Sequence, residues 1–265
     1  IYKYNVNVKS LGNGTASRES EEVIAEMISE IKEETGKEIA YVIVSEAGAS
    51  VYSASELATK EYPDLDVTVR GAISIGRRLQ DPLAELVKID PKAIGVGQYQ
   101  HDVTPKKLEE SLAGVVEDSV NTVGVDLNIA TPSLLTHISG INAAIAKNIV
   151  DYREEAGHFT SRKELLKVKR LGQKAYEQCA GFLRVAESKE PLDNTSVHPE
   201  SYDAAKKLIG VLGYDNEALK NNKLGDIDEK AECYGISKLS KELEIGEMTL
   251  KDIIKELKKP GRDPR

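Results

Sequence analysis

The amino-terminal part of the chain alternates between short apolar runs and longer amphipathic stretches. Alternating tyrosine, valine and polar residues predict a strand over 1–8, and a run rich in β-branched residues predicts a buried parallel strand over 39–44. Between them, apolar residues at one-face spacing predict a helix over 17–35, with Ser17 or Ser20 as its N-cap.

The same alternation continues to about residue 100. A short helix is expected near 55–61, and a longer helical stretch over 69–89 with a break at Asp81-Pro82. The sequence AIGVG at 93–97 is typical of a short strand or a turn. Helices and strands in turn predict an α/β fold for this segment.

The remainder of the chain has only helical periodicity. A helix is expected over 104–123, and a second amphipathic helix over 199–212 that ends at Gly213. The stretch 191–198 has no periodicity and is interpreted as a linker, as is the tail 259–265. The residues expected on the buried face of the first of these helices are Leu108, Leu112, Val115, Val116 and Val120.

Two segments of the helical part repeat each other. Residues 134–150 align with residues 164–180 at an offset of 30, and each copy reads as a short helix, a turn with one glycine, and a second helix. The glycines are Gly140 and Gly172. The matching apolar pairs are Leu135 with Leu165, Ile138 with Val168, Ile141 with Leu171, and Ile149 with Cys179.

Capping signals mark the start of each copy. Thr131 precedes Pro132 at the first helical position, and Ser161 with Glu164 predicts a capping box. The whole unit resembles a tandem helix-hairpin-helix module, although the usual turn of that family is Gly-hydrophobic-Gly. The turns here are Gly140-Ile141-Asn142 and Arg170-Leu171-Gly172.

Charge changes the interpretation of this repeat. The chain carries a net charge of -8, which alone argues against nucleic-acid binding. Residues 131–185 nevertheless carry +4, between 109–130 at -5 and 186–265 at -3, while 1–108 carry -4. A basic segment between acidic neighbours can attract a polyanion locally.

The hairpins therefore predict a phosphate-binding surface. The first N–H groups of the helix after each turn lack helical partners and lie at the positive end of the helix dipole, and glycine lets a backbone approach closely. Such contacts are independent of sequence and sensitive to salt. The alternative is that the two hairpins have only a structural role and bind no ligand. The candidate binding residues are Ser139, Gly140, Ile141, Asn142, Lys147, Lys167, Lys169, Arg170, Leu171, Gly172, Gln173 and Lys174.

Several functional classes are not supported. Cys179 and Cys233 are far apart, and the four histidines form no ligand-spaced cluster, so we expect no disulfide framework, no metal and no cofactor. No apolar run is long enough for a membrane helix, and the first residues show no signal-peptide pattern. We expect a cytoplasmic protein with no membrane partner, and interpret the chain, which begins with Ile, as a fragment or a processed product.

Longer strings extend the resemblance to a family. GNGTASRE at 12–19, VSEAGASVYSASE at 44–56, the stretch 73–103, the hairpin pair and PLDNTSVHPESY at 191–202 resemble the Tex family of bacterial transcription accessory proteins. The resemblance implies a multidomain, mainly α chain with a truncated α/β domain. The implied parts are the carboxyl-terminal part of a YqgF-type, RNase H-like domain (1–108), a tandem helix-hairpin-helix domain (109–190), a second helical, helix-hairpin-helix-like domain (191–258) and a linker (259–265). In the second helical domain, residues 243–257 read as a helix, a turn at Gly246 and a helix, and the acidic residues beside this turn favour packing or protein contact over DNA binding.

The family resemblance also frames the functional alternatives. It implies that the chain binds RNA or DNA during transcription and associates with RNA polymerase. One alternative to nucleic-acid binding is therefore a scaffold that contacts only proteins such as the polymerase. A metal-dependent, resolvase-like nuclease is the other, with Glu46 and Asp81 as candidate carboxylates. We expect no enzyme activity, because this carboxylate set is incomplete and Asp81 also suits an N-cap. Arg77 and Arg78 are interpreted as solvated charges.

Overall fold

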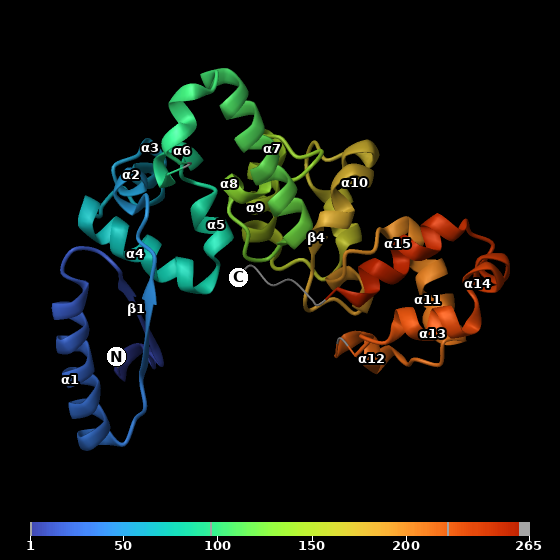
Figure 1. The fold of residues 1–265 in the computed structure, drawn as a ribbon, viewed down its shortest axis with the longest axis horizontal. Coiled ribbons are helices and arrows are strands. Elements are labelled where there is room, and N and C mark those ends of the chain that lie inside the picture. The colour runs from blue at the N-terminus through green and yellow to red at the C-terminus, as the bar shows by residue number, and fades with distance from the viewer. Residues whose placement is uncertain (1, 96, 222, 260–265) are drawn as a thin grey trace. The chain divides into compact units, whose positions relative to one another are not determined.

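The fold is described from a computed structural model, which describes residues 2–95, 97–221 and 223–259. The chain divides into two compact units, one up to Leu112 and the other from Ala113 onward (Figure 1). Helix α7 (Pro105–Val123) contributes residues to both units. No helix among the described residues combines the length and apolarity needed to cross a lipid bilayer.

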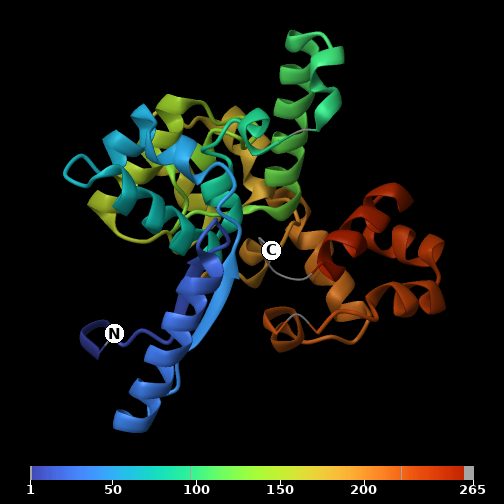
Figure 2. The same cartoon turned by 60° about the vertical axis from the view of Figure 1, so that its left-hand side comes forward.

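The first unit opens with a βαβ arrangement. Strands β1 (Val8–Gly12) and β2 (Ala40–Val44) pair in parallel, with Val8 opposite Ala40 and Gly12 opposite Val44. Helix α1 (Ser17–Thr35) connects them and runs alongside the strands (Figure 2). The strand expected over 1–8 is thus wrong in position, because Tyr2–Tyr4 form the 3₁₀ turn η1 and pairing begins only at Val8. Ile1 lies outside the described residues.

Helix α1 starts without a side-chain cap. Its N-cap is Ala16, not Ser17 or Ser20 as expected: the N–H of Ser17 donates to the carbonyl of Gly14, and the Ser20 hydroxyl donates back to the carbonyl of Ala16. The helix ends as expected at Gly36, which adopts the left-handed conformation at φ 68°.

The expected parallel strand β2 forms, but it is not buried. The side chains of Val42 and Ile43 are 39% and 51% exposed. Within the part of the chain that the structure describes, this sheet consists of β1 and β2 only. Val42 and Ile43 are consecutive and point to opposite faces, so neither face of β2 is fully covered.

Short helices complete the first unit. Asp81 breaks the longer stretch as expected, because its carboxylate accepts a hydrogen bond from the N–H of Ala84 at 3.1 Å and Pro82 follows. The expected strand or turn at 93–97 is instead the end of a helix and the glycine after it; residue 96 is outside the described set. The elements are α2 (Ala49–Ser53), α3 (Glu56–Glu61), α4 (Val67–Gln80), α5 (Pro82–Leu86), α6 (Pro91–Ile94) and the 3₁₀ helix η2 (Gln98–Asp102).

The second unit begins with the repeated hairpins. Two short strands flank the pair and join in parallel, with Val125 opposite Leu183. Its elements are β3 (Val125–Asp126), α8 (Pro132–Leu135), α9 (Ala143–Ala156), η3 (Arg162–Lys167), α10 (Gln173–Cys179), η4 (Ala180–Phe182) and β4 (Leu183–Arg184).

The apolar positions of the repeat form the core of the pair. Leu135 and Leu165 are both fully buried, as is Cys179, whose burial raises the pKa of its thiol to about 12. Helix α7 contributes Val120 to this region, whereas Val115, which we expected to be buried, is 62% exposed. The spacing of apolar residues on one face therefore predicted the helix correctly, but it predicted a larger buried face than the structure shows.

The capping box of the second hairpin forms only in part. Ser161 makes no side-chain capping bond, and the element that follows is the 3₁₀ helix η3. Glu164 instead accepts hydrogen bonds from the N–H and hydroxyl of Thr160, one residue earlier than expected.

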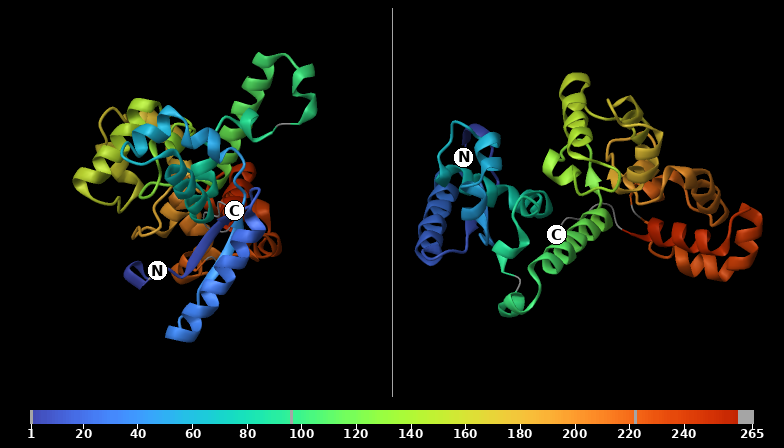
Figure 3. Two further views of the ribbon diagram at one scale, coloured as in Figure 1. Left: turned by 90° about the vertical axis from the view of Figure 1, so that its left-hand side faces the viewer. Right: turned by 90° about the horizontal axis from the view of Figure 1, so that it is seen from above.

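A second helical bundle follows the hairpins and has its own core. Figure 3 shows its helices grouped at one end of the second unit. Its elements are η5 (Pro191–Asn194), η6 (Pro199–Ser201), α11 (Tyr202–Val211), α12 (Asn216–Lys220), α13 (Ile227–Tyr234), α14 (Ile236–Leu243) and α15 (Glu247–Lys258). Fully buried side chains at its centre include Leu192, Leu208, Leu239 and Leu250.

The segment expected as a linker joins the two cores. Leu192 and Asp193 are buried, and the side chain of Arg162 is completely buried against this segment. The Arg162 guanidinium donates to the carbonyls of Leu183, Val197 and Thr195 and to the Tyr202 hydroxyl, and its backbone N–H donates to Asp193. The linker interpretation of 191–198 was wrong because these long-range hydrogen bonds order a stretch without periodicity.

Candidate nucleic-acid interface

The two hairpin turns have the same backbone geometry. Gly140 and Arg170 occupy equivalent positions, and both are left-handed, with φ of 82° and 67°. After them, the N–H of Ile141 donates to the carbonyl of Ile138, and the N–H of Leu171 donates to that of Val168. Arg170 therefore adopts the glycine-type conformation although it carries a side chain.

The turn of the first hairpin is packed against the second. A Cβ on Gly140 would lie 2.8 Å from Cβ of Gln178 and 3.2 Å from the carbonyl oxygen of Ala175, both in α10. This glycine allows close packing inside the protein, whereas we had expected it to allow close approach of a phosphate. Asn142 also uses its carboxamide to cap α9, accepting from the N–H of Ile145 at 3.0 Å.

The turn of the second hairpin is open. Apart from its two chain neighbours, no described residue places an atom within 4 Å of a Cβ built on Gly172, and this residue caps α10 without a side chain. Lys169, Arg170 and Lys174 are exposed, and the described part of the chain places no carboxylate within 4 Å of their charged groups. The first amides of α10 and three free cations thus surround one accessible turn.

Each turn is held by the second helix of the other hairpin. The side-chain amide of Asn148, in α9, donates to the carbonyl of Lys169 at 2.7 Å. Gln178, at the equivalent position in α10, lies against Gly140. The two hairpins therefore hold each other's turns, and the second turn presents three free cations beside the first amides of α10.

The other candidate residues fall into an exposed group and a buried group. Lys147 and Ser139 are exposed, while Ile141 and Leu171 are 5% and 3% exposed and serve the core, so only their backbone is available to a ligand. Gln173 binds Glu177 through its side chain at 2.9 Å.

Lys167 is not a free cation. Its Nζ lies 3.0 Å from Oε1 of Glu164, and this contact raises the pKa of Lys167. The pKa of Glu164 is lowered, first by the hydrogen bond from the Thr160 backbone and further by Lys167. Because the Lys167 side chain is 63% exposed, the contribution of this ion pair to stability is small.

The second helical domain contains two further hairpins, one of which the sequence indicated. Gly213 is left-handed and Asp215 caps α12 through the N–H of Ala218, which repeats the geometry of Gly140 and Asn142. Glu244 is left-handed and Gly246 caps α15, as Arg170 and Gly172 do before α10. Only the helix-Gly246-helix pattern signalled one of them. Their turns carry Asp215, Glu244 and Glu247, which repel phosphate.

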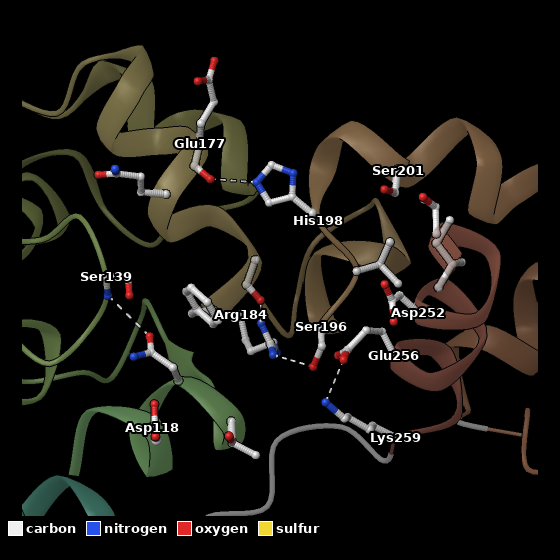
Figure 4. Close-up of a pocket in the computed structure, with 18 residues that line it drawn as sticks. Asp118, Ser139, Glu177, Arg184, Ser196, His198, Ser201, Asp252, Glu256 and Lys259 are labelled. Carbon is white, nitrogen blue, oxygen red and sulfur yellow. Dashed lines mark hydrogen bonds and ion pairs between the residues drawn. The ribbon is translucent and has the colours of Figure 1, made fainter. Parts of the chain in front are cut away.

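A cavity of about 810 Å³ lies between α7, the first hairpin, α10 and α15 (Figure 4). Four carboxylates line it, against two cationic side chains, so it does not suit a polyanion. His198 donates to the carbonyl of Glu177 at 2.9 Å, and Arg184 donates to the Ser196 hydroxyl at 2.8 Å. The carboxylates are Asp118, Glu177, Asp252 and Glu256, and the cations are Arg184 and Lys259.

The candidate nuclease carboxylates do not form a metal centre with other ligands. Among the described residues, no group of three or more histidine, cysteine or acidic side chains is arranged to hold a metal ion. Asp81 caps α5, and Glu46 lies against the loop after β1. Arg77 and Arg78 are not solvated as expected: Arg77 binds Glu85 at 3.0 Å, and Arg78 is only 5% exposed.

Comparison with known proteins is consistent with this architecture. Residues 1–80 match the Tex protein YqgF-like domain, residues 120–184 the helix-hairpin-helix motif, and residues 190–265 a further HHH domain. The third match agrees with the additional hairpins found in the structure.

Relatives match along nearly the whole chain. It is 55% identical over 265 residues to an uncharacterized protein of Bacillus subtilis (strain 168), covering 100% of this chain and 36% of that protein. It is 53% identical to the transcriptional accessory protein Tex of Neisseria gonorrhoeae (100% and 34%), and 40% identical to the human S1 RNA-binding domain-containing protein 1 (98% and 31%). The chain spans about a third of the length of these relatives. With a Tex YqgF-like domain, two helix-hairpin-helix domains and this similarity, the chain belongs to the Tex family.

Proposed function

We propose that the chain binds the phosphate backbone of nucleic acid through its second hairpin, and that this binding contributes to a transcriptional accessory role. The proposal rests on one observation: the turn at Arg170-Leu171-Gly172 is open, and Lys169, Arg170 and Lys174 surround it without internal partners among the described residues. Helix amides and free cations are the groups that bind phosphate oxygens.

The contacts available at this turn are independent of base identity. Backbone N–H groups and lysine or arginine side chains reach phosphates, and nothing in them distinguishes one base from another. Binding should then weaken with salt and show little dependence on sequence. The first hairpin contributes Lys147 and the first amides of α9, which belong to the exposed residues Ala143 and Ala144, as secondary contacts.

The test is a fluorescence-anisotropy titration at low salt with labelled duplex DNA, single-stranded DNA and RNA of several sequences. The Arg170→Glu/Lys174→Glu variant should lose at least about tenfold in affinity, since each reversal replaces attraction by repulsion. A Lys207→Glu/Lys241→Glu variant makes the same change in charge on exposed positions of α11 and α14 and should bind nearly normally. Equal losses in both variants would refute a hairpin-specific site.

A protein-interaction scaffold, associated for example with RNA polymerase, is the second candidate. The acidic turns at Asp215 and at Glu244-Glu247 favour a protein partner over nucleic acid on that part of the chain. The scaffold alone is supported if no nucleic acid binds at low salt while polymerase is retained on the immobilised chain.

We further propose that the chain is not a nuclease. The separate roles of Asp81 as a cap and of Glu46 beside the β1 loop support this proposal. Magnesium-dependent cleavage that disappears in Glu46→Gln would overturn it.

A further inference from the structure

A glycine-rich loop joins β1 to α1 at the carboxyl end of the parallel sheet. It runs Gly12-Asn13-Gly14-Thr15 and leads into a 19-residue helix whose N-cap, Ala16, has no side chain able to accept a hydrogen bond. The N–H of Ser17 donates to the carbonyl of Gly14, but the next N–H groups of the first turn lack helical partners and lie at the positive end of the helix dipole. Strand, glycine loop and helix in this order form the usual phosphate cradle of βαβ units.

An anionic group already fills the space beside this loop. Glu46, just after β2, donates its backbone N–H to Oδ1 of Asn13 at 3.1 Å. A Cβ on Gly12 would lie 2.5 Å from Oε2 of Glu46, and one on Gly14 would lie 1.7 Å from Oε1. The two glycines thus make room for the Glu46 carboxylate, which has no hydrogen-bond donor among the described residues.

A buried guanidinium with free donors lies behind the same bend. Arg78 is 5% exposed, and its Nη1 donates to the carbonyls of Ser45 and Ala47, on either side of Glu46, at 2.8 Å each. Its Nε and Nη2 are buried, and no acceptor for them is found in the described residues. Buried donors without partners are costly, so this edge of the guanidinium is suited to an anion.

We propose that the β1–α1 loop is a phosphate-binding site that Glu46 occupies while the site is unliganded. On binding, the phosphate takes the space over Gly12 and Gly14 at the amino terminus of α1, where the exposed Arg18 adds positive charge. The displaced Glu46 carboxylate turns to the free Nε and Nη2 of Arg78. The ligand is a phosphate group, carried either by a nucleotide or by a nucleic-acid backbone. This site lies in the first unit and does not rest on the hairpins.

The experiment is equilibrium dialysis of the full chain against radiolabelled inorganic phosphate at low ionic strength. We expect saturable retention of one phosphate per chain. Glu46→Gln removes a negative charge from the occupied space and should tighten binding by about fivefold or more. This gain of binding cannot arise from misfolding.

Gly14→Ala should abolish retention, because its methyl group fills the space beside the loop. Gly71→Ala is the matched control: its methyl group would contact only Ser53, at 3.8 Å, and retention should be unchanged. Competition by ADP and by a short oligonucleotide distinguishes the two sources of phosphate.

The proposal is overturned if neither the wild-type chain nor Glu46→Gln retains phosphate saturably, or if Gly14→Ala retains it normally. The Arg170→Glu/Lys174→Glu variant must keep its phosphate. Loss in that variant would assign the label to the hairpin and also contradict the proposal.

Discussion

Arg170→Gly should stabilise the fold and weaken nucleic-acid binding at the same time. Arg170 has φ of 67°, while the equivalent residue of the first hairpin is a glycine with φ of 82°. Glycine adopts this conformation without steric cost, and the substitution also removes one free cation from the open turn. The two effects have opposite signs, so a loss of binding cannot be attributed to unfolding.

The magnitudes follow from the backbone and the charge. A left-handed conformation costs a residue with a Cβ about 1–2 kcal/mol. A glycine at this position lowers the free energy of unfolding by about 0.5–1 kcal/mol, because it gives the unfolded chain more conformational freedom. The net gain in the free energy of unfolding is then about 0–1.5 kcal/mol. If Arg170 neutralises one phosphate of a duplex, the slope of log K against log salt becomes shallower by about 0.9.

Urea unfolding followed by circular dichroism measures the first quantity, and anisotropy titrations at several salt concentrations measure the second. Lys163→Ala makes the same change of charge at an exposed position of η3 away from the turn, and should leave the salt slope unchanged. A destabilised Arg170→Gly variant would contradict the backbone argument. An unchanged salt slope would contradict the phosphate contact.

Three further variants test other parts of the structure. Arg162→Met should lower the free energy of unfolding by about 3–5 kcal/mol, measured by urea denaturation, because it removes a buried cation and leaves the carbonyls of Leu183, Val197 and Thr195 without their donor; a loss below about 1 kcal/mol would be inconsistent with that role. Burial lowers the pKa of His137 below its ordinary 6.5, so the unfolded chain binds the proton more readily and stability should fall as pH drops below that value; His137→Gln should reduce this pH dependence, and identical pH profiles would argue against it. Glu164→Gln frees Lys167 and should strengthen DNA binding at low salt several-fold by anisotropy, whereas weaker binding would show that Lys167 does not reach the ligand.

The features predicted correctly from the sequence are those set by local chemistry. The break at Asp81-Pro82 follows from a carboxylate that caps a helix and a proline that suits its first position. The hairpin pair was recognisable because its buried residues recur at a fixed offset, and Leu135 and Leu165 are both fully buried.

The features that were missed depend on contacts distant in sequence. The role of Gly140 is set by Gln178, which lies on another helix, and the order of 191–198 is set by hydrogen bonds from Arg162. The exposure of β2 depends on how many layers cover the sheet, which an apolar run does not reveal. The hairpin at Gly213-Tyr214-Asp215 was not predicted because its turn carries the acidic Asp215 and lacks the basic residues that marked the second hairpin.

An amide ¹H–¹⁵N NMR titration of the chain with a short DNA duplex tests the central claim most directly. The account predicts that the largest chemical-shift changes fall on the amides of Gly172, Gln173 and Lys174, with smaller changes at Ala143 and Ala144. Changes concentrated in helices α11 to α15, with the second hairpin unaffected, would contradict it.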